Sequence, residues 1–406
     1  MANNLLTPTV IVKEALGLFV NSNAFIKKVP RQYDDRFGVT GAKIGTQLQI
    51  RNPNDYVVRT GPTAVPQSTN ETAQPLVLAT QKGVDIAFSS LDMTLTIDDF
   101  RDRYLKPMMN NLTAKVASDV ISGLTKVPNL VHAVDGNGNT ISPGFDEWAT
   151  AGAVLDTRNA PRDGNRFVVV DPISQARTLS AFKGLFNNQQ KVGEQYTRGM
   201  MGTDVLGFDW MMDQSIPVHK EAAYGTLPTV NGANQTGSSI TVTAMTAPLN
   251  IGDIIQIANV NAVNRTNKIT TGLPMQFSVT ANVPAGSTVI PIYPALVGPG
   301  VGGVDAAGMT VDALPANGAV ISAPVKAGES YRSNLAFHSS AVTMVTADLI
   351  LPNGVHQAAR EDYDGVSLRM VTDYDVISDQ LITRFDVAYG FAWLRPEWAV
   401  IVADRL

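Results

Sequence analysis

The strongest constraint on the fold is a change of composition over residues 226–327. This stretch contains six charged side chains and is rich in Gly, Pro, Thr, Val and Asn. Short runs at 239–243, 253–257 and 276–280 alternate with turn signals. Short β-branched runs between Gly- and Pro-containing turns are typical of a small barrel or sandwich. The sequence therefore predicts an all-β barrel at 226–327.

On either side of this barrel the chain returns to mixed helix and strand patterns. Residues 218–220 precede the barrel, and residues 337–339 follow it. We expect the barrel to be an insertion whose two ends are held close together by a host domain. His219 and His338 both lie at predicted strand ends, so this arrangement could bring them together.

The N-terminal residues 1–30 predict an arm that carries a short amphipathic helix. Pro8 suits the first turn of this helix, because that turn needs no backbone N–H donor. Pro30 ends the segment. The apolar positions expected on the buried side are Val10, Ile11, Ala15, Leu16, Phe19 and Val20.

Strand patterns on either side of a polar stretch predict an extended hairpin. They lie at 47–50, 56–58 and 76–88. Residues 60–75, which are rich in Pro, Thr, Gln and Asn, separate them. We therefore expect two long strands that enclose a polar tip.

A capping box and a long apolar stripe predict one long helix at 98–124. Thr96 and Asp99 have the spacing at which a first helical turn is capped. The apolar residues that follow recur at intervals of three and four, which marks one buried face. They are Phe100, Tyr104, Leu105, Met108, Met109, Leu112, Val116, Val120, Ile121 and Leu124. Such a helix is roughly 40 Å long, and Pro107 is expected to kink it.

Residues 127–225 predict a mixed α/β region. Residues 165–170 are apolar enough for a buried strand, and Asp171 and Pro172 provide the start of a helix. A further strand pattern begins at residue 207. Mixed α/β character resumes after the barrel and continues to the end of the chain.

Composition disfavours several classes of protein. Charged residues make up 17% of the chain, against about 25% in an ordinary soluble domain, so we expect neighbouring subunits to cover much of the surface. The net charge of −5 without a long basic run disfavours tight nucleic-acid binding. Cysteine is absent, which excludes disulfides and thiolate metal sites. We find no signal-peptide pattern and no apolar run long enough to span a membrane.

Two glycine-containing motifs have part of the pattern of a binding site. Residues 135–139 match the start of a calcium loop, but Thr140 stands where the loop needs Gly and Asp146 where it needs Glu. A hairpin turn is the preferred interpretation. Residues 298–303 match the letters of a dinucleotide fingerprint, but strand and turn patterns follow where a helix is required.

The remaining polar candidates favour structural roles. No two of the four histidines have the spacing of a helical zinc site, and we prefer hydrogen-bonded structural histidines to metal ligands. No Gly-x-Ser-x-Gly elbow is present. The C-terminal region contains the richest polar cluster, for which ion pairs within or between subunits are preferred to acid/base pairs of an enzyme. Its members are Asp373, Asp375, Arg384, Asp386 and Arg395. We predict no catalytic, cofactor-binding or metal site.

The C-terminal segments resemble a known class of shell-forming proteins. Residues 337–344, 383–390 and 394–397 are similar to the closing strands of the major capsid proteins of tailed bacteriophages. The order of arm, hairpin, long helix, α/β region, inserted barrel and strand-rich closure resembles the Hong Kong 97-type capsid fold. In particular it resembles the coat proteins of short-tailed Salmonella phages, and residues 250–256 and 277–280 resemble their insertion domain.

The resemblance implies an α+β fold with a defined division of the chain. Its parts are an N-terminal arm at 1–44, an E-loop hairpin at 45–90, a peripheral domain at 91–150 with its spine helix at 98–124, an axial and peripheral α/β core at 151–225, the inserted barrel at 226–327, and the axial domain and closing peripheral strands at 328–406. Flexible parts, the arm and the E-loop, are expected to absorb differences between nearly equivalent positions in a shell.

The resemblance also implies a function. The chain is expected to be a major capsid protein that self-assembles, as hexamers and pentamers, into the icosahedral shell enclosing phage DNA. A long charged N-terminal extension is missing, so the scaffold is expected to be either separate or absent, and a separate scaffolding protein is preferred. A portal protein, a decoration protein and weak, non-specific contact with DNA are expected as further partners. Assembly is expected in the host cytoplasm, and the virion is the final location. The alternative is another self-assembling virion component, such as a tail or adhesin protein. A secreted polysaccharide-active enzyme is disfavoured, because no signal peptide or carboxylate pair is identified.

Some Hong Kong 97-type shells join their subunits covalently, through an E-loop lysine and an asparagine of a neighbour. This chain has no lysine between Lys43 and Lys82. We therefore predict a shell held together by non-covalent contacts. The candidates for pairs between subunits are Arg51, Arg59, Glu71, Arg384, Asp386 and Arg395.

Overall fold

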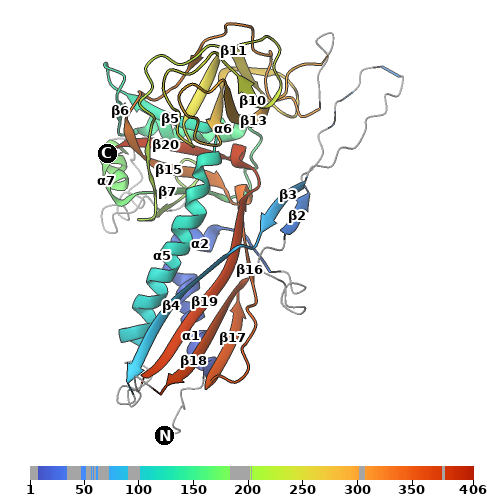
Figure 1. The fold of residues 1–406 in the computed structure, drawn as a ribbon. Coiled ribbons are helices and arrows are strands. Elements are labelled where there is room, and N and C mark those ends of the chain that lie inside the picture. The colour runs from blue at the N-terminus through green and yellow to red at the C-terminus, as the bar shows by residue number, and fades with distance from the viewer. Residues whose placement is uncertain are drawn as a thin grey trace. The chain divides into compact units, whose positions relative to one another are not determined.

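The computed structural model describes most of the chain and divides it into two compact units (Figure 1). The described residues are 8–33, 47–51, 73–89, 101–182, 204–300, 307–376 and 380–406, with the single positions 56, 58, 61, 62 and 202. Unit 1 comprises Met1–Ile50, Ala73–Val120 and Val342–Leu394, and unit 2 comprises Arg51–Thr72, Ile121–Ala341 and Arg395–Leu406. Each unit thus joins segments that are distant in sequence. Within the described ranges, no helix is both long and apolar enough to cross a membrane.

Unit 1 is organised around a mostly antiparallel sheet in which β19 is the central strand. Its strands are β1 (Arg31–Tyr33), β4 (Thr80–Ser89), β16 (Val342–Ala347), β17 (Gln357–Tyr363), β18 (Val366–Asp375) and β19 (Gln380–Trp393). Their order is β1-β16-β19-β18-β17, and β4 also pairs with β19. Asp364 and Gly365 form the tight turn between β17 and β18, with φ angles of 51° and 72°. An Asp-Gly turn with both φ angles positive matches the twist of the strands that it joins.

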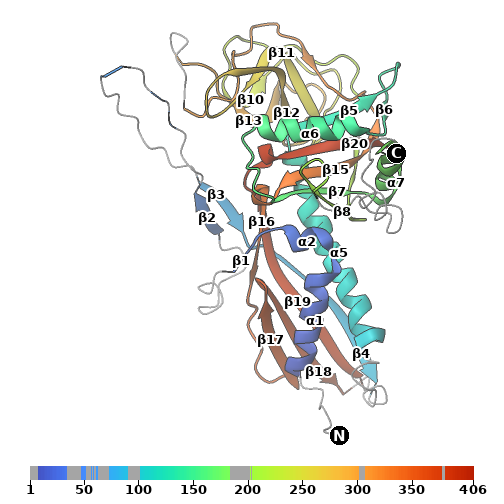
Figure 2. The same cartoon turned by 180° about the vertical axis from the view of Figure 1, so that it is seen from behind.

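The predicted N-terminal helix is confirmed, but it is part of the core of unit 1. Helix α1 (Pro8–Ser22) packs against β17 and β18, and α2 (Ala24–Lys28) follows it (Figure 2). The described part of the expected flexible arm is therefore a packed element, because its apolar side faces the sheet. Its buried residues are Val12, Ala15, Leu16, Phe19, Val20, Phe25 and Ile26. Val10, expected on the buried side, is 43% exposed, and Val12 takes that place.

The predicted long helix is composed of three helical types in sequence. A π-helical turn, η2 (Arg101–Leu105), precedes the α-helix α5 (Lys106–Ser122), and a 3-10 turn, η3 (Gly123–Lys126), follows it. Pro107 is the second residue of α5 and comes directly after the π-helical turn. The change from π-helix to α-helix falls at Lys106, immediately before this proline. The apolar stripe is confirmed for Leu105, Met108, Met109, Leu112, Val116, Val120, Ile121 and Leu124, which are buried, whereas Tyr104 is half-buried. The capping box and Phe100 lie outside the described residues.

Unit 2 contains a seven-stranded sheet covered by helices. Its order is β6-β5-β20-β15-β7-β8, and β9 also pairs with β15. The strands are β5 (Asn129–Val134), β6 (Thr140–Ile141), β7 (Arg166–Val170), β8 (Asp209–Met212), β9 (Val218–Lys220), β15 (Ser330–His338) and β20 (Ala399–Arg405). The predicted strand at 165–170 and the helix after it, α7 (Pro172–Phe182), are confirmed. Helix α6 (Phe145–Thr157) was not predicted, although Glu147 accepts a hydrogen bond from the Gly144 amide at 2.7 Å and so caps its first turn.

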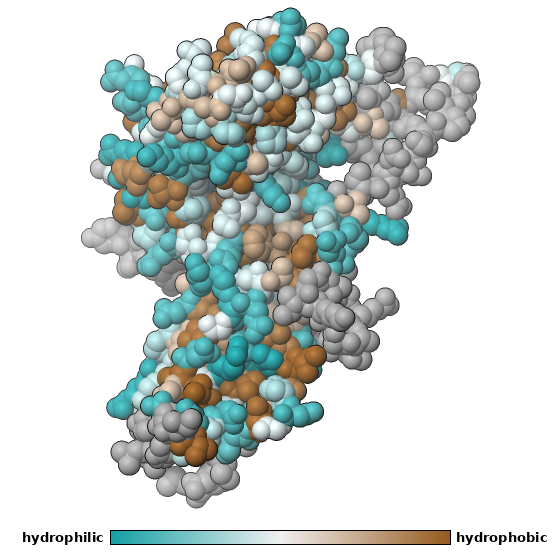
Figure 3. Space-filling view, viewed as in Figure 1, coloured by the Kyte–Doolittle hydropathy of each residue, from teal (hydrophilic) through white to brown (hydrophobic). Residues whose placement is uncertain are grey.

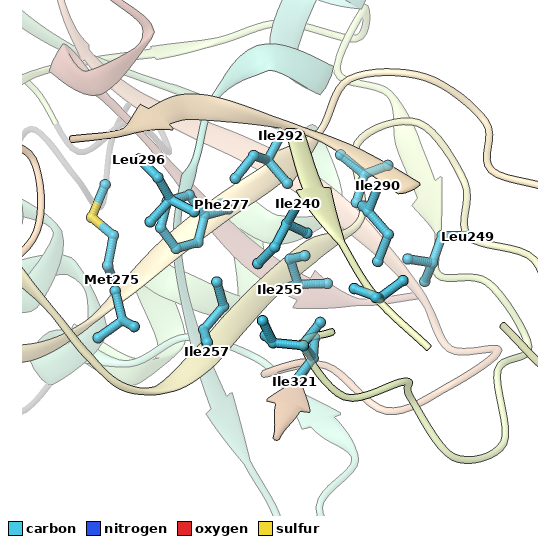
Figure 4. Packing of buried hydrophobic residues seen from close by; sticks show 14 of the residues in the cluster. Ile240, Leu249, Ile255, Ile257, Met275, Phe277, Ile290, Ile292, Leu296 and Ile321 are labelled. Carbon is cyan, nitrogen blue, oxygen red and sulfur yellow. The ribbon is translucent and has the colours of Figure 1, made fainter. Parts of the chain in front are cut away.

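The inserted segment of unit 2 forms a closed barrel with its own core (Figure 4). Its strands are β10 (Gly237–Thr241), β11 (Ile254–Val263), β12 (Thr270–Val279), β13 (Val289–Leu296) and β14 (Ile321–Ser322), in the order β10-β13-β12-β11-β14. The edges are joined by Thr229, which bridges to Val320 beside β14, and Val230, which bridges to Val242 beside β10. Ile240, Ile255, Phe277 and Ile290 are fully buried in its interior.

The two ends of the insertion lie side by side, as expected. The strand before the insertion, β9, pairs with the beginning of β15 and not with the segment around His338. β9 pairs antiparallel with residues 330–332 of β15, and the Glu221 amide donates to the Glu329 carbonyl at 2.8 Å. His219 faces Tyr331, whereas His338 faces Arg166. Tyr331 and His338 are about 23 Å apart along β15 at about 3.3 Å per residue, so the suggestion that His219 and His338 could meet is wrong.

The predicted hairpin is present in part. Strand β2 (Gln47–Arg51) pairs with β3 (Ala73–Val77) in a two-stranded sheet. The expected second strand, 76–88, is divided, because β4 leaves the hairpin and pairs with β19. Residues 63–72 of the tip lie outside the described residues. At 135–139 the structure has the preferred hairpin turn between β5 and β6, in which Asp135 accepts from the amides of Asn137 and Asn139.

Candidate assembly surfaces and buried polar contacts

A buried carboxylate organises the central strand of unit 1. Asp386 is 1% exposed and accepts hydrogen bonds from Arg369 Nη2 at 2.6 Å and from Arg384 Nε at 2.9 Å. It also faces Gly83 of β4, where an added Cβ would lie 2.5 Å from Asp386 Oδ1. Burial alone would raise the pKa of Asp386, but the two guanidinium groups outweigh it and lower that pKa. Glycine at position 83 thus makes room for the ion pairs.

A second polar contact joins α5 to the sheet of unit 1. Asp119 forms an ion pair with Lys82 of β4 and accepts a hydrogen bond from Tyr389 Oη at 2.5 Å. Burial opposes ionisation of Asp119, but Lys82 and Tyr389 together lower its pKa. Burial and the Asp119 carboxylate raise the pKa of Tyr389. The amino group of Lys82 is therefore engaged inside the subunit.

The predicted contact residues occupy different environments. Arg51 is exposed at the end of β2, and the Arg384 side chain is 48% exposed although it pairs with Asp386. Arg395 is half-buried, with its guanidinium 4.0 Å from the ring centre of Trp398. Arg59 and Glu71 lie outside the described residues. Among the described members of this set, the structure brings Arg384 and Asp386 together, and the role of the whole set between subunits stays a prediction.

Large apolar side chains are exposed on unit 1, mainly around the ends of its strands. Ile350 is 67% exposed and Val376 is 79% exposed. Further members are Leu351, Tyr363, Tyr374 and Ile382. Apolar side chains also reach the surface on the face drawn in Figure 3. These side chains leave apolar area exposed on the surface of unit 1.

Within unit 2, hydrogen bonds from barrel side chains attach the barrel to the rest of the unit. The Gln276 side chain accepts from the Leu130 amide at 2.7 Å and donates to the Leu130 carbonyl at 3.0 Å. Ser278 donates to the Thr125 carbonyl, and Tyr293 donates to Glu397 at 2.9 Å. Sequence reasoning missed these residues. The usable signal was the alternation on β12, where Gln276 and Ser278 lie between the buried Met275, Phe277 and Val279.

A cluster of titratable groups lies where the chain enters the barrel. His219 Nε2 is 3.0 Å from Asp253 Oδ1 and 3.6 Å from Glu221 Oε2. Burial would lower the pKa of His219, but the two neighbouring carboxylates raise it to about 9. Burial raises the pKa of Glu221 to about 7. No sequence motif indicated this cluster, because Asp253 lies 34 residues after His219.

The other barrel-flanking histidine has a hydrogen-bonded structural role, as expected. His338 Nε2 lies 3.0 Å from Asp163 Oδ1, and its ring packs edge-on against Trp398. Hydrogen bonds from Asn165 and His338 lower the pKa of Asp163 to about 2. The glycine motif at 298–303 lies partly outside the described residues.

Comparison with known proteins identifies one family over nearly the whole chain. The family model described as "P22 coat protein - gene protein 5" matches residues 2–402. A search of curated proteins finds no match.

Solved structures similar to the chain include a protein of Mycobacterium phage Che8, with 12% identity, a TM-score of 0.46 and coverage of 93% of this chain and 90% of that one. The capsid structure of cyanophage P-SCSP1u has 12% identity, a TM-score of 0.43 and coverage of 93% and 85%. The CUS-3 coat protein I-domain has 29% identity over 24% of this chain and 93% of its own length, with a TM-score of 0.19.

Proposed function

Because the chain belongs to the P22 coat protein family, it is a major capsid protein of an icosahedral shell, and we propose that its subunits are joined without covalent bonds. The family match over residues 2–402 carries the assignment. The α+β fold expected for a Hong Kong 97-type capsid protein with an inserted barrel is confirmed.

Two observations support non-covalent assembly. Lys82 is the first lysine after Lys43, and its amino group is paired with Asp119 inside the subunit. The exposed apolar groups around Ile350 and Val376 offer area that a neighbouring subunit can bury. Exposed ion pairs contribute little individually, about 0–1 kcal/mol each. The strength of the shell therefore comes from many repeated contacts.

A closed shell requires one chain to occupy several nearly equivalent positions in hexamers and pentamers. We assign the adjustment to these different positions to the E-loop. Within the described residues, β2 and β3 pair in a sheet of two strands, and such hairpins have little stability of their own. The sheet around β19, with its buried Asp386, is the rigid part in this proposal.

Assembly of the shell involves partner proteins and takes place inside the host cell in this proposal. A separate scaffolding protein, a portal protein and a decoration protein are the expected partners, and assembly takes place in the host cytoplasm before the protein becomes part of the virion shell. The net charge of −5 is consistent with only weak contact with packaged DNA. The chain carries out no catalytic turnover in this proposal.

The test is assembly of the purified protein. The chain expressed alone, or with a candidate scaffold, is expected to form shells, tubes or spirals in negative-stain electron microscopy. Ile350→Lys, at a site 67% exposed, is expected to keep the circular dichroism spectrum and to lower the particle yield. A strictly monomeric wild-type protein in light scattering at high concentration, with and without scaffold, contradicts the proposal.

A further inference from the structure

Three metal-ligating side chains meet at the entrance to the barrel. His219 lies on β9, Glu221 directly follows it, and Asp253 directly precedes β11. One donor atom from each lies within 4.8 Å of the others. The shortest separation is 3.0 Å, between His219 Nε2 and Asp253 Oδ1. Two separate parts of unit 2 therefore place an imidazole and two carboxylates around one point.

The cluster holds two buried carboxylates beside a single imidazole. The side chains of His219, Glu221 and Asp253 are 17%, 1% and 0% exposed. Among the described residues, neither oxygen of Glu221 makes a hydrogen bond, and no lysine or arginine forms an ion pair with Glu221 or Asp253. A buried carboxylate without a donor is costly unless a cation or a proton compensates it.

Surrounding contacts hold the donor atoms in place. Asp253 Oδ2 accepts from the Asn250 amide at 2.8 Å, so Oδ1 is directed to His219. The His219 ring packs against Tyr331, with ring centres 5.4 Å apart. Gly252 has a φ angle of 93°, and an added Cβ would lie 3.2 Å from His219 Cε1. Outer contacts of this kind orient the ligands of metal sites.

We propose that His219, Glu221 and Asp253 bind a divalent cation of the zinc type. Zinc accepts imidazole nitrogen and carboxylate oxygen at about 2.0–2.2 Å in tetrahedral geometry, which places ligand atoms roughly 3.3 Å apart. The observed separations of 3.0 Å and 3.6 Å from His219 Nε2 lie close to this value. Water can supply the fourth ligand, because His219 is partly exposed. Calcium and magnesium prefer more ligands, all of them oxygen.

The bound cation would fasten β9 to the first long strand of the barrel. It neutralises the two carboxylates and links the incoming chain to Asp253, so it stabilises the junction of the barrel with its host sheet. This inference goes beyond the proposed function. Shell assembly by zinc-free protein would contradict neither the capsid assignment nor the existence of the site.

The experiment uses the full-length chain, treated with chelator and then dialysed against zinc. The wild type is expected to retain one zinc per chain by elemental analysis, and its thermal midpoint is expected to rise when zinc is added. Glu221→Gln and His219→Gln are each expected to bind zinc at least tenfold more weakly. Asp163→Asn, which changes the other histidine–aspartate pair of unit 2, is the matched control and is expected to bind as the wild type does.

The proposal is overturned if the wild type retains no stoichiometric zinc, or if Glu221→Gln binds zinc with unchanged affinity. If a proton rather than a metal compensates Glu221, the wild type shows no zinc-dependent stabilisation. Cobalt(II) absorption of the wild type alone keeps the test decisive even if a variant fails to fold. Cobalt(II) bound at the site should give the visible absorption bands of tetrahedral coordination. Added zinc should displace the cobalt and remove these bands. Absence of these bands contradicts the site.

Discussion

Arg369 and Asp386 face each other directly on β18 and β19, and Arg369 Nη2 lies 2.6 Å from Asp386 Oδ2. Arg384 approaches the same carboxylate from two positions earlier on β19. These contacts join β18 to β19 at a carboxylate that is 1% exposed, and Gly83 of the neighbouring β4 leaves the space for it. The pair of Arg369 and Asp386 thus belongs to the interior of the subunit.

Asp386→Asn is expected to destabilise the subunit strongly. The substitution removes the charge that compensates Arg369, whose side chain is 15% exposed. Breaking such a pair from one side leaves an uncompensated charge and costs on the order of 3 kcal/mol. Chemical denaturation with circular dichroism measures the effect. Asp373→Asn, at an exposed position of β18, is the control, and equal losses for the two variants would show that the buried pair does not matter.

The same carboxylate is expected to contribute to acid sensitivity. Its pKa is lowered in the folded state, so its contribution to stability is fully present above the unfolded value of about 3.9. That contribution is lost as the pH falls through the folded pKa. The difference in unfolding free energy between wild type and Asp386→Asn should therefore shrink below about pH 4. A difference that stays constant between pH 6 and acid would contradict the lowered pKa.

Leu112→Ala is expected to lower the free energy of unfolding by about 2–5 kcal/mol. Leu112 is 3% exposed on the buried stripe of α5, so truncation leaves a cavity. Asn111→Ala changes the adjacent exposed position and is expected to be mild. Denaturant titration measures the unfolding free energy of both variants. Similar losses for the two would contradict the assignment of Leu112 to the buried face.

The barrel is expected to fold as an isolated fragment. Its core residues all lie between Ala222 and Ile321, and Tyr224 Oη donates to the Val325 carbonyl at 2.6 Å. A fragment of residues 222–327 should therefore give dispersed amide signals in NMR spectra. The shorter fragment 226–327 should be less stable, because it lacks Ala222 and Tyr224. A random-coil spectrum from the longer fragment would contradict an autonomous domain.

Purified particles boiled in detergent are expected to run as a single band near 43.4 kDa. Lys82 is held by Asp119, and the sequence offers no other lysine between Lys43 and that position. A ladder of covalent oligomers without added cross-linker would refute the non-covalent shell. Lys82→Arg, which preserves the charge, is the control, because any such ladder that depends on Lys82 should then disappear.

Local periodicity alone was enough to predict several elements. It predicted the stripe through Leu112 and Val116 on α5, the buried strand at 165–170 and the barrel strands. Neighbouring residues determine which side of a helix or strand is apolar, so these elements can be predicted locally. The composition of 226–327 likewise marked the inserted barrel before any contact was known.

Pairings between distant segments were decided only by tertiary structure. The sequence did not indicate that β4 pairs with β19, that Asp386 lies over Gly83, or that Asp253 meets His219. Strand register and partner choice depend on how whole faces pack, and residues far apart in the chain meet only after that packing is complete. The sequence therefore determined the elements and their buried faces, whereas the tertiary structure determined which polar groups share a site.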